Sequence, residues 1–165
     1  MARAAKRILL VDDYKVWREF ASKMLEQETK LQVVAEAADG LQAVQLAHQL
    51  EPELILLDVG LPGMNGIETA RQIRQVSPNS EILFLSENQS EDIAEAALST
   101  GARGYVVKSA ALRELLPAVE AVLQHRKFVS AIFRCHNLPD VVRNVSDIPS
   151  QKPTPRDGDF LMDDD

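Results

Sequence analysis

Five short apolar runs constrain this chain more than any other feature of its sequence. They are Ile8–Val11, Leu31–Val34, Leu54–Leu57, Ile82–Leu85 and Tyr105–Val107. Each run lacks the alternation of polar and apolar residues that a strand with one wet face shows, so each is typical of a strand covered on both faces. Segments with helical periodicity separate the runs. Five strands alternating with five helices predict a doubly wound α/β fold, in which a parallel sheet carries helices on both sides.

The starts of two helices can be read from capping residues. Asp39 and Asn65 stand before helical segments, and Gln42 and Glu68 follow them at the spacing of a capping box. A further helix is expected to begin at Ser90. These signals place helices between the predicted strands.

Size, charge and cysteine content limit the class of protein. The 165 residues, 45% of them hydrophobic, suit one compact domain with a short appendage. A net charge of -7 opposes binding to nucleic acid or anionic lipid. The single cysteine, Cys135, permits no internal disulfide and gives no cysteine spacing typical of a zinc site. The first apolar run is too short for a signal peptide or a membrane span. We therefore expect a cytoplasmic protein that is not inserted in a membrane.

The composition changes after Arg126. Four prolines, scattered polar residues and the acidic end Asp163–Asp165 predict a mobile tail over residues 127–165, with at most a turn or two of helix at Pro139–Val145. A DNA-binding unit with a recognition helix needs roughly sixty residues, more than this tail offers. The predicted organisation is one domain over residues 1–126 and a Pro-rich acidic tail without a complete DNA-binding domain.

The candidate functional residues stand where the predicted strands end. Asp12 and Asp13 follow the first strand, Asp58 the third, Ser86 the fourth and Lys108 the fifth. Ligands of open parallel sheets bind beyond the carboxyl ends of the strands, so these side chains are expected to converge. Three converging carboxylates repel one another and favour a divalent cation.

Mg²⁺ suits these oxygen ligands. Asp13 and Asp58 are the candidate carboxylate ligands, Asp12 acts directly or through water, and Gly60 offers its main-chain carbonyl. If Asp58 attacks a phosphoryl group, the cation and Lys108 neutralise the developing charge. The Ser86 hydroxyl donates a hydrogen bond to the product, which is an acyl phosphate on Asp58.

The chain resembles the receiver domain of bacterial two-component response regulators. The resemblance rests on Leu9–Asp13, Leu56–Gly66, Ser86 and Gly104–Ser109, and it covers roughly residues 7–126. It implies a flavodoxin-like sheet with strand order 2-1-3-4-5. It also implies a phosphoacceptor that takes its phosphoryl group from a sensor histidine kinase and catalyses only its own phosphorylation and dephosphorylation.

By this resemblance each site residue has a role. Asp58 is the phosphoacceptor, Asp12 and Asp13 are the acidic pair at the metal, and Lys108 matches the lysine of the family pattern. Ser86 and Tyr105 form a switch pair that reshapes the face made by helix 4, strand 5 and helix 5. A downstream protein partner or a second copy of the chain is expected to bind that face.

The sequence departs from the family pattern at two positions. Glu87 follows Ser86, where the family usually has a small residue, and its charge predicts slow or donor-selective phosphorylation. Ser109 follows Lys108, where the family often has a proline in a cis bond. A cis bond before serine costs about 3 kcal/mol, so the sequence leaves that geometry open.

Other readings of the same residues stay open. An Asp-Asp pair after a strand also serves as a helix cap or turn, Ser86 also suits a loop hydroxyl, and Tyr105 also suits an ordinary sheet aromatic. For the whole chain, the alternatives are a truncated DNA-binding transcriptional regulator, suggested by the family branch that Gly104–Ser130 resembles, a metal-dependent phosphohydrolase, and a receiver that docks partners without phosphorylation.

Overall fold

The computed structural model describes residues 4–136 as strands and helices in alternation. The strands are β1 (Lys6–Val11), β2 (Leu31–Ala37), β3 (Leu54–Leu57), β4 (Glu81–Ser86), β5 (Gly104–Val107) and β6 (Phe128–Val129). The α-helices are α1 (Lys15–Glu26), α2 (Gly40–Leu50), α3 (Gly66–Val76), α4 (Glu91–Leu98) and α5 (Ala111–Leu123), with short 3₁₀ helices η1 (Lys108–Ala110) and η2 (Ala131–His136).

The strands form one parallel sheet in the order β2-β1-β3-β4-β5-β6. The flavodoxin-like order predicted for the first five strands is confirmed. The sixth strand was not predicted, because two residues are too few to show a periodicity. Its pairing with β5 extends the sheet beyond the expected end of the domain.

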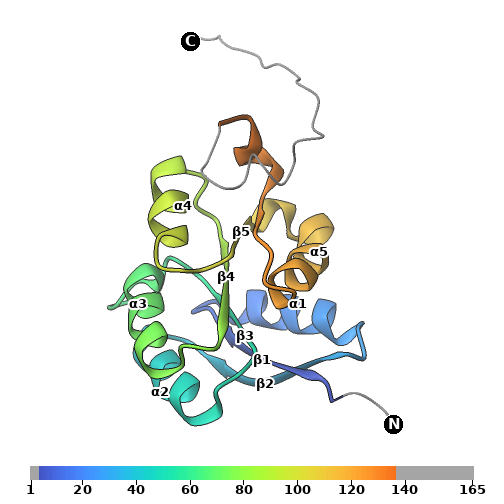
Figure 1. Cartoon of the computed structure of the whole chain (residues 1–165), viewed down its shortest axis with the longest axis vertical. Coiled ribbons are helices and arrows are strands. Elements are labelled where there is room, and N and C mark those ends of the chain that lie inside the picture. Colours follow the sequence, from blue (N-terminus) through green and yellow to red (C-terminus); the bar gives the residue numbers. More distant parts are fainter. Residues whose placement is uncertain (1–3, 137–165) are drawn as a thin grey trace.

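Helices cover both faces of the sheet, as Figure 1 shows, with α1 and α5 on one side and α2, α3 and α4 on the other. Successive residues of β1 explain why its run is uniformly apolar. Ile8 and Leu10 belong to the core under α1 and α5, whereas Leu9 and Val11 belong to the opposite core. All four side chains are buried, so neither face of the strand has a position where a polar side chain would meet water.

The predicted caps are present. The Asp39 side chain accepts a hydrogen bond from the Gln42 N–H at 2.8 Å, and the Asn65 side chain accepts one from the Glu68 N–H at 3.0 Å. Ser90 caps α4 in the same way. These bonds satisfy N–H groups that the first helical turn leaves free, and they fix where the helices begin.

A buried polar pair anchors the segment after α5. The Ser130 hydroxyl accepts a hydrogen bond from the Val107 N–H at 2.8 Å and donates one to Glu114 at 2.5 Å. The Ala131 N–H donates to the other Glu114 oxygen at 3.1 Å. The predicted tail therefore begins with residues that pack on β5 and α5, while the predicted helix at Pro139–Val145 and the acidic end lie outside the described residues.

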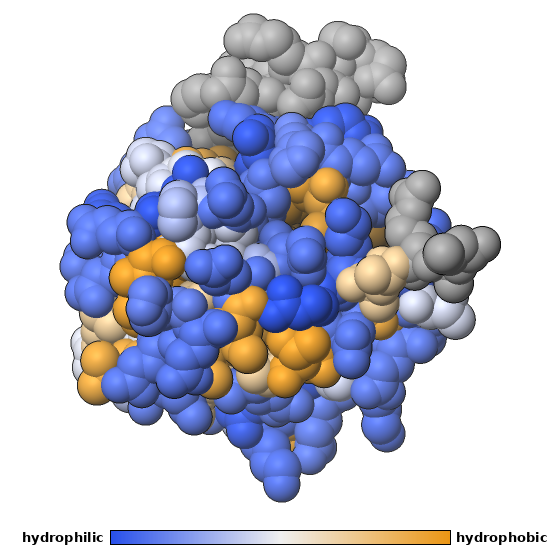
Figure 2. Space-filling model, turned by 60° about the horizontal axis from the view of Figure 1, so that its bottom comes forward, coloured by the Kyte–Doolittle hydropathy of each residue, from blue (hydrophilic) through white to orange (hydrophobic). Residues whose placement is uncertain are grey.

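The exterior is mostly polar on the face drawn in Figure 2, where apolar side chains occur in small groups among hydrophilic ones. Within residues 4–136, no helix is both long enough and apolar enough to span a bilayer.

Candidate phosphoacceptor site

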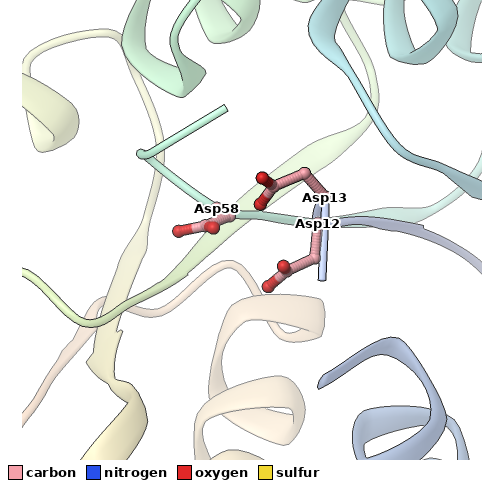
Figure 3. A group of neighbouring side chains, drawn as sticks. All are labelled: Asp12, Asp13 and Asp58. Carbon is pink, nitrogen blue, oxygen red and sulfur yellow. The ribbon is translucent and has the colours of Figure 1, made fainter. Parts of the chain in front are cut away.

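Three carboxylates converge at the carboxyl edge of the sheet. Asp12 and Asp13 follow β1, Asp58 follows the neighbouring strand β3, and one oxygen from each lies within 4.8 Å of the others. Figure 3 shows the three side chains grouped beyond the ends of these strands. Asp12 and Asp58 are buried, whereas Asp13 is exposed. The cluster is therefore buried at Asp12 and Asp58 and accessible to solvent at Asp13.

Lys108 brings a positive charge from the start of η1 to this cluster. Its ammonium nitrogen lies 2.7 Å from Asp12 Oδ2 and 3.4 Å from Asp58 Oδ2. Its side chain is only 5% exposed, so solvent screens these contacts weakly. One buried cation thus faces two buried anions, and part of the negative charge remains uncompensated.

Asp12 is held at both its side chain and its main chain. Its Oδ1 accepts a hydrogen bond from the Tyr14 N–H at 2.9 Å, which is the turn geometry that an aspartate after a strand often adopts. Arg18 donates to the Asp12 carbonyl at 2.6 Å and pairs with Glu36 at 2.8 Å. The turn role and the contact with Lys108 therefore coexist, because they use different oxygens.

The surroundings of Asp58 raise the pKa of its carboxyl group. Burial is the main cause that raises the pKa of Asp58, the Asp12 charge raises it further, and Lys108 and the Gly60 N–H partly offset the rise. A carboxyl whose pKa is raised in the folded state is unfavourably ionised there. A further cation at the cluster would relieve that penalty.

A pocket of about 480 Å³ opens onto the cluster. The residues that line it are Asp13, Tyr14, Asp58, Val59, Gly60, Ser86, Glu87, Asn88 and Lys108. Gly60 donates its N–H to Asp58 Oδ1 at 3.3 Å, while the predicted use of its carbonyl as a metal ligand stays a prediction.

The peptide bond between Lys108 and Ser109, whose geometry the sequence left open, is trans, since the described part of the chain contains no cis peptide bond.

These residues fit a Mg²⁺ ion. The donors are carboxylate oxygens, which Mg²⁺ prefers, and they are close enough to share one ion. The exposed side, next to the pocket, leaves room for the waters that Mg²⁺ retains. Asp13 and Asp58 would supply ligands directly, and Asp12 directly or through water.

Comparison with known proteins decides the family. The sequence model of one protein family, the response regulator receiver domain, matches residues 8–120. This chain belongs to that family. The match contains Asp12, Asp13, Asp58, Ser86 and Lys108 and ends within α5.

Relatives of this receiver domain include two regulators at moderate identity. The chain is 34% identical over 123 residues to the transcriptional regulatory protein DegU of Brevibacillus brevis, which is 74% of the chain and 52% of that protein. It is 38% identical over 112 residues to the nitrate/nitrite response regulator protein NarL of Escherichia coli K12, which is 68% of the chain and 52% of that protein. The chain therefore spans about half the length of these relatives.

A solved structure has the same fold. The two-component response regulator of the LuxR family from Aurantimonas sp. SI85-9A1 superposes with a TM-score of 0.73 at 35% identity. The match covers 87% of this chain and 97% of that one. The flavodoxin-like architecture of this receiver domain is thus that of a known response regulator.

The two residues predicted to form a switch pair, Ser86 and Tyr105, lie on adjacent strands. Ser86 ends β4 and accepts a hydrogen bond from the Asn88 N–H at 3.0 Å. Tyr105 on β5 is fully buried, and its hydroxyl donates to the Asn88 carbonyl at 2.8 Å. Burial is also the main cause that raises the pKa of Tyr105. The bond to Asn88 connects the buried Tyr105 side chain to the loop that follows Ser86, although a role in switching stays a prediction.

Glu87 contributes an exposed carboxylate to the pocket of the receiver domain. We expect Glu87→Ala to speed phosphorylation by acetyl phosphate severalfold, because an exposed like charge near the entering anion contributes about 1 kcal/mol of repulsion. Intact-mass time courses measure the rate. Glu95→Ala, which removes an exposed charge from α4, serves as the control. Equal rates for the parent and Glu87→Ala would contradict the predicted role.

Gly66 allows α3 to approach the backbone of Asp58, which follows β3. A Cβ added at Gly66 would lie 2.0 Å from the Asp58 carbonyl oxygen, whereas one at Gly60 would meet nothing within 4 Å. We expect Gly66→Ala to lower the free energy of unfolding by about 1–3 kcal/mol, because the backbone must shift to admit the methyl group. Gly60→Ala is the matched control in chemical denaturation. A Gly66→Ala variant as stable as the control would contradict the close approach.

Three supporting residues of the receiver domain were not recognised from sequence. Arg18, Asn88 and Glu114 hold the Asp12 carbonyl, the Tyr105 hydroxyl and the Ser130 hydroxyl. Each contact joins residues from different elements, and none forms part of a short motif. Only Arg18, about one turn into the helix after the acidic pair, offered a positional clue.

Proposed function

We propose that this protein is a phosphoacceptor response regulator of a two-component system. A sensor histidine kinase supplies the phosphoryl group, and Asp58 accepts it with Mg²⁺ as cofactor. One observation carries the proposal: Asp58 lines an open pocket while Lys108, Asp12 and Asp13 surround it. This set combines a nucleophile, a fixed cation and ligands for a second cation.

The proposed reaction needs little covalent chemistry from the protein. An Asp58 oxygen attacks phosphorus, the bond between phosphorus and the donor breaks, and an acyl phosphate forms. Lys108 neutralises charge on the phosphoryl oxygens, and the Ser86 hydroxyl turns from Asn88 to donate to one of them. Bound Mg²⁺ would supply further positive charge to the same oxygens. Because water can hydrolyse the acyl phosphate, the signal is temporary, and the protein acts on no other substrate.

The proposed output is a change on the face of α4, β5 and α5. Movement of Ser86 toward the phosphoryl group breaks its bond with Asn88, whose carbonyl also holds Tyr105. The loop before α4 and the ring of Tyr105 therefore shift together. A downstream protein or a second copy would recognise the altered face in the cytoplasm.

A second candidate function is DNA-binding transcriptional regulation. The favouring observation is that this chain spans only about half of relatives such as DegU, whose name describes a transcriptional regulatory protein. In that case residues 8–120 are the receiver domain of a longer regulator. Residues 127–165 are not expected to bind DNA by themselves. A metal-dependent phosphohydrolase has less support. Such an enzyme commonly has its nucleophile on the first strand and a second acid two residues further on. In this chain Asp12 and Asp13 are adjacent after β1, and the proposed acceptor, Asp58, follows β3.

The proposed function can be tested with a small phosphodonor. Incubation with acetyl phosphate and Mg²⁺ is expected to add one phosphoryl group to the protein, as measured by intact mass. Chelation of Mg²⁺ should prevent the addition, because Lys108 alone leaves the cluster undercompensated. A protein that never takes up phosphate, or takes it up equally under chelation, would refute the proposal.

A further inference from the structure

The indole ring of Trp17 lies against the cation of the site. The Lys108 ammonium nitrogen is 5.0 Å from the centroid of the Trp17 ring, within the range of a cation–π interaction. The same nitrogen contacts Asp12 at 2.7 Å and Asp58 at 3.4 Å. The ammonium is therefore held between two carboxylates and one aromatic face.

Trp17 is itself fixed in place. It lies on α1, half-buried, and meets the Phe20 ring edge-on at 5.0 Å with an interplanar angle of 83°. Both rings pack against the core under α1 and α5. Because these contacts hold the Trp17 ring in one orientation, its face presents a fixed surface to Lys108.

We propose that Trp17 is a positioning residue for Lys108, and this inference rests on the proposed function. A lysine side chain has a flexible four-carbon stem, and ordering it for one contact loses conformational entropy. The indole face restricts the ammonium to the space beside the cluster before a phosphoryl group arrives. Phosphorylation by any donor thus starts with Lys108 close to its final place.

The alternative is that Trp17 only fills the core beneath α1. Trp17→Leu removes the aromatic face and keeps an apolar side chain, whereas Trp17→Phe keeps a weaker face. Leu25→Val changes the packing of the same helix at a residue that is fully buried in the core and keeps Trp17 and Lys108 unchanged. All rates are compared below the unfolding temperature of every variant.

We expect the phosphorylation rate with acetyl phosphate and Mg²⁺ to fall on the order of tenfold in Trp17→Leu, as the strength of a partly buried cation–π contact implies. Trp17→Phe should lie between Trp17→Leu and the parent, and Leu25→Val should match the parent. All variants should still take up one phosphoryl group. Parent-like rates in Trp17→Leu, or equal losses in Trp17→Leu and Leu25→Val, would overturn the proposal.

A second measurement needs no phosphorylation. Trp17 is the single tryptophan of the chain, so tryptophan fluorescence reports on the surroundings of this ring. Lys108→Met removes the charge over the ring and should change the emission without any donor present. Unchanged emission would overturn the contact. If the parent took up no phosphate but Lys108→Met changed the emission, the proposed function would fail while the contact remained.

Discussion

Asp58→Asn is expected to abolish uptake of phosphate from acetyl phosphate while leaving the protein folded. Asparagine keeps the shape of the side chain and removes the nucleophilic oxygen. Intact mass measures the loss, and Asp92→Asn, on the exposed surface of α4, is the matched control that should react like the parent. Phosphate uptake by Asp58→Asn at the parent level would contradict the assignment of the phosphoacceptor.

The same substitution should change the pH dependence of stability. Because the pKa of Asp58 is raised in the folded state, its ionised form opposes folding. This destabilisation is absent at pH values below 3.8, the ordinary pKa of an aspartate, and complete at pH values above the raised pKa of Asp58. The free energy of unfolding therefore falls as the pH rises between these two pKa values. Without Mg²⁺, Asp58→Asn should therefore be more stable than the parent at neutral pH. Denaturant titrations should show this gain disappearing in acid, and a gain independent of pH would contradict the argument.

Lys108→Met is expected to slow phosphorylation by about a hundredfold or more. Loss of one preorganised charge that stabilises the transition state has an effect of this order. The ammonium nitrogen lies 3.4 Å from Asp58, and among the described residues Lys108 is the basic side chain that forms an ion pair with this carboxylate. Its removal also takes away the interaction that lowers the pKa of Asp58. Single-turnover labelling in the presence of Mg²⁺ measures the rate.

A control separates this effect from a general change of charge. Lys23→Met removes an exposed charge from the last turn of α1 and should react like the parent. Lys108→Met should also be less stable than the parent by about 3 kcal/mol at neutral pH, because two buried carboxylates lose their partner. Addition of Mg²⁺ should restore part of that stability. Equal phosphorylation rates in the two lysine variants would contradict the role of Lys108.

The acidic cluster could be predicted from sequence because a parallel sheet brings its strand ends together. Once the runs before Asp12 and Asp58 are recognised as buried parallel strands, their final side chains must share an edge. The helix starts at Asp39 and Asn65 were equally accessible, since capping depends on residues three apart. In each case the relevant physics is local or follows from the topology.

The supporting contacts could not be predicted in this way. Trp17 reaches Lys108, and Glu114 reaches Ser130, only after helices have packed on the sheet. Side-chain contacts between distant elements depend on rotamers and on helix placement, and neither has a sequence periodicity. For the same reason the sequence suggested a tail from residue 127, where the structure has β6 and η2 packed on the domain.

The most direct test locates the phosphoryl group on the chain. After reaction with acetyl phosphate and Mg²⁺, reduction with borohydride converts an aspartyl phosphate into homoserine, which is stable to digestion and peptide sequencing by mass spectrometry. The proposed chemistry predicts homoserine at position 58 and at no other aspartate. A mark on a different aspartate, or phosphate retained on a serine or histidine with Asp58 unchanged, would contradict it.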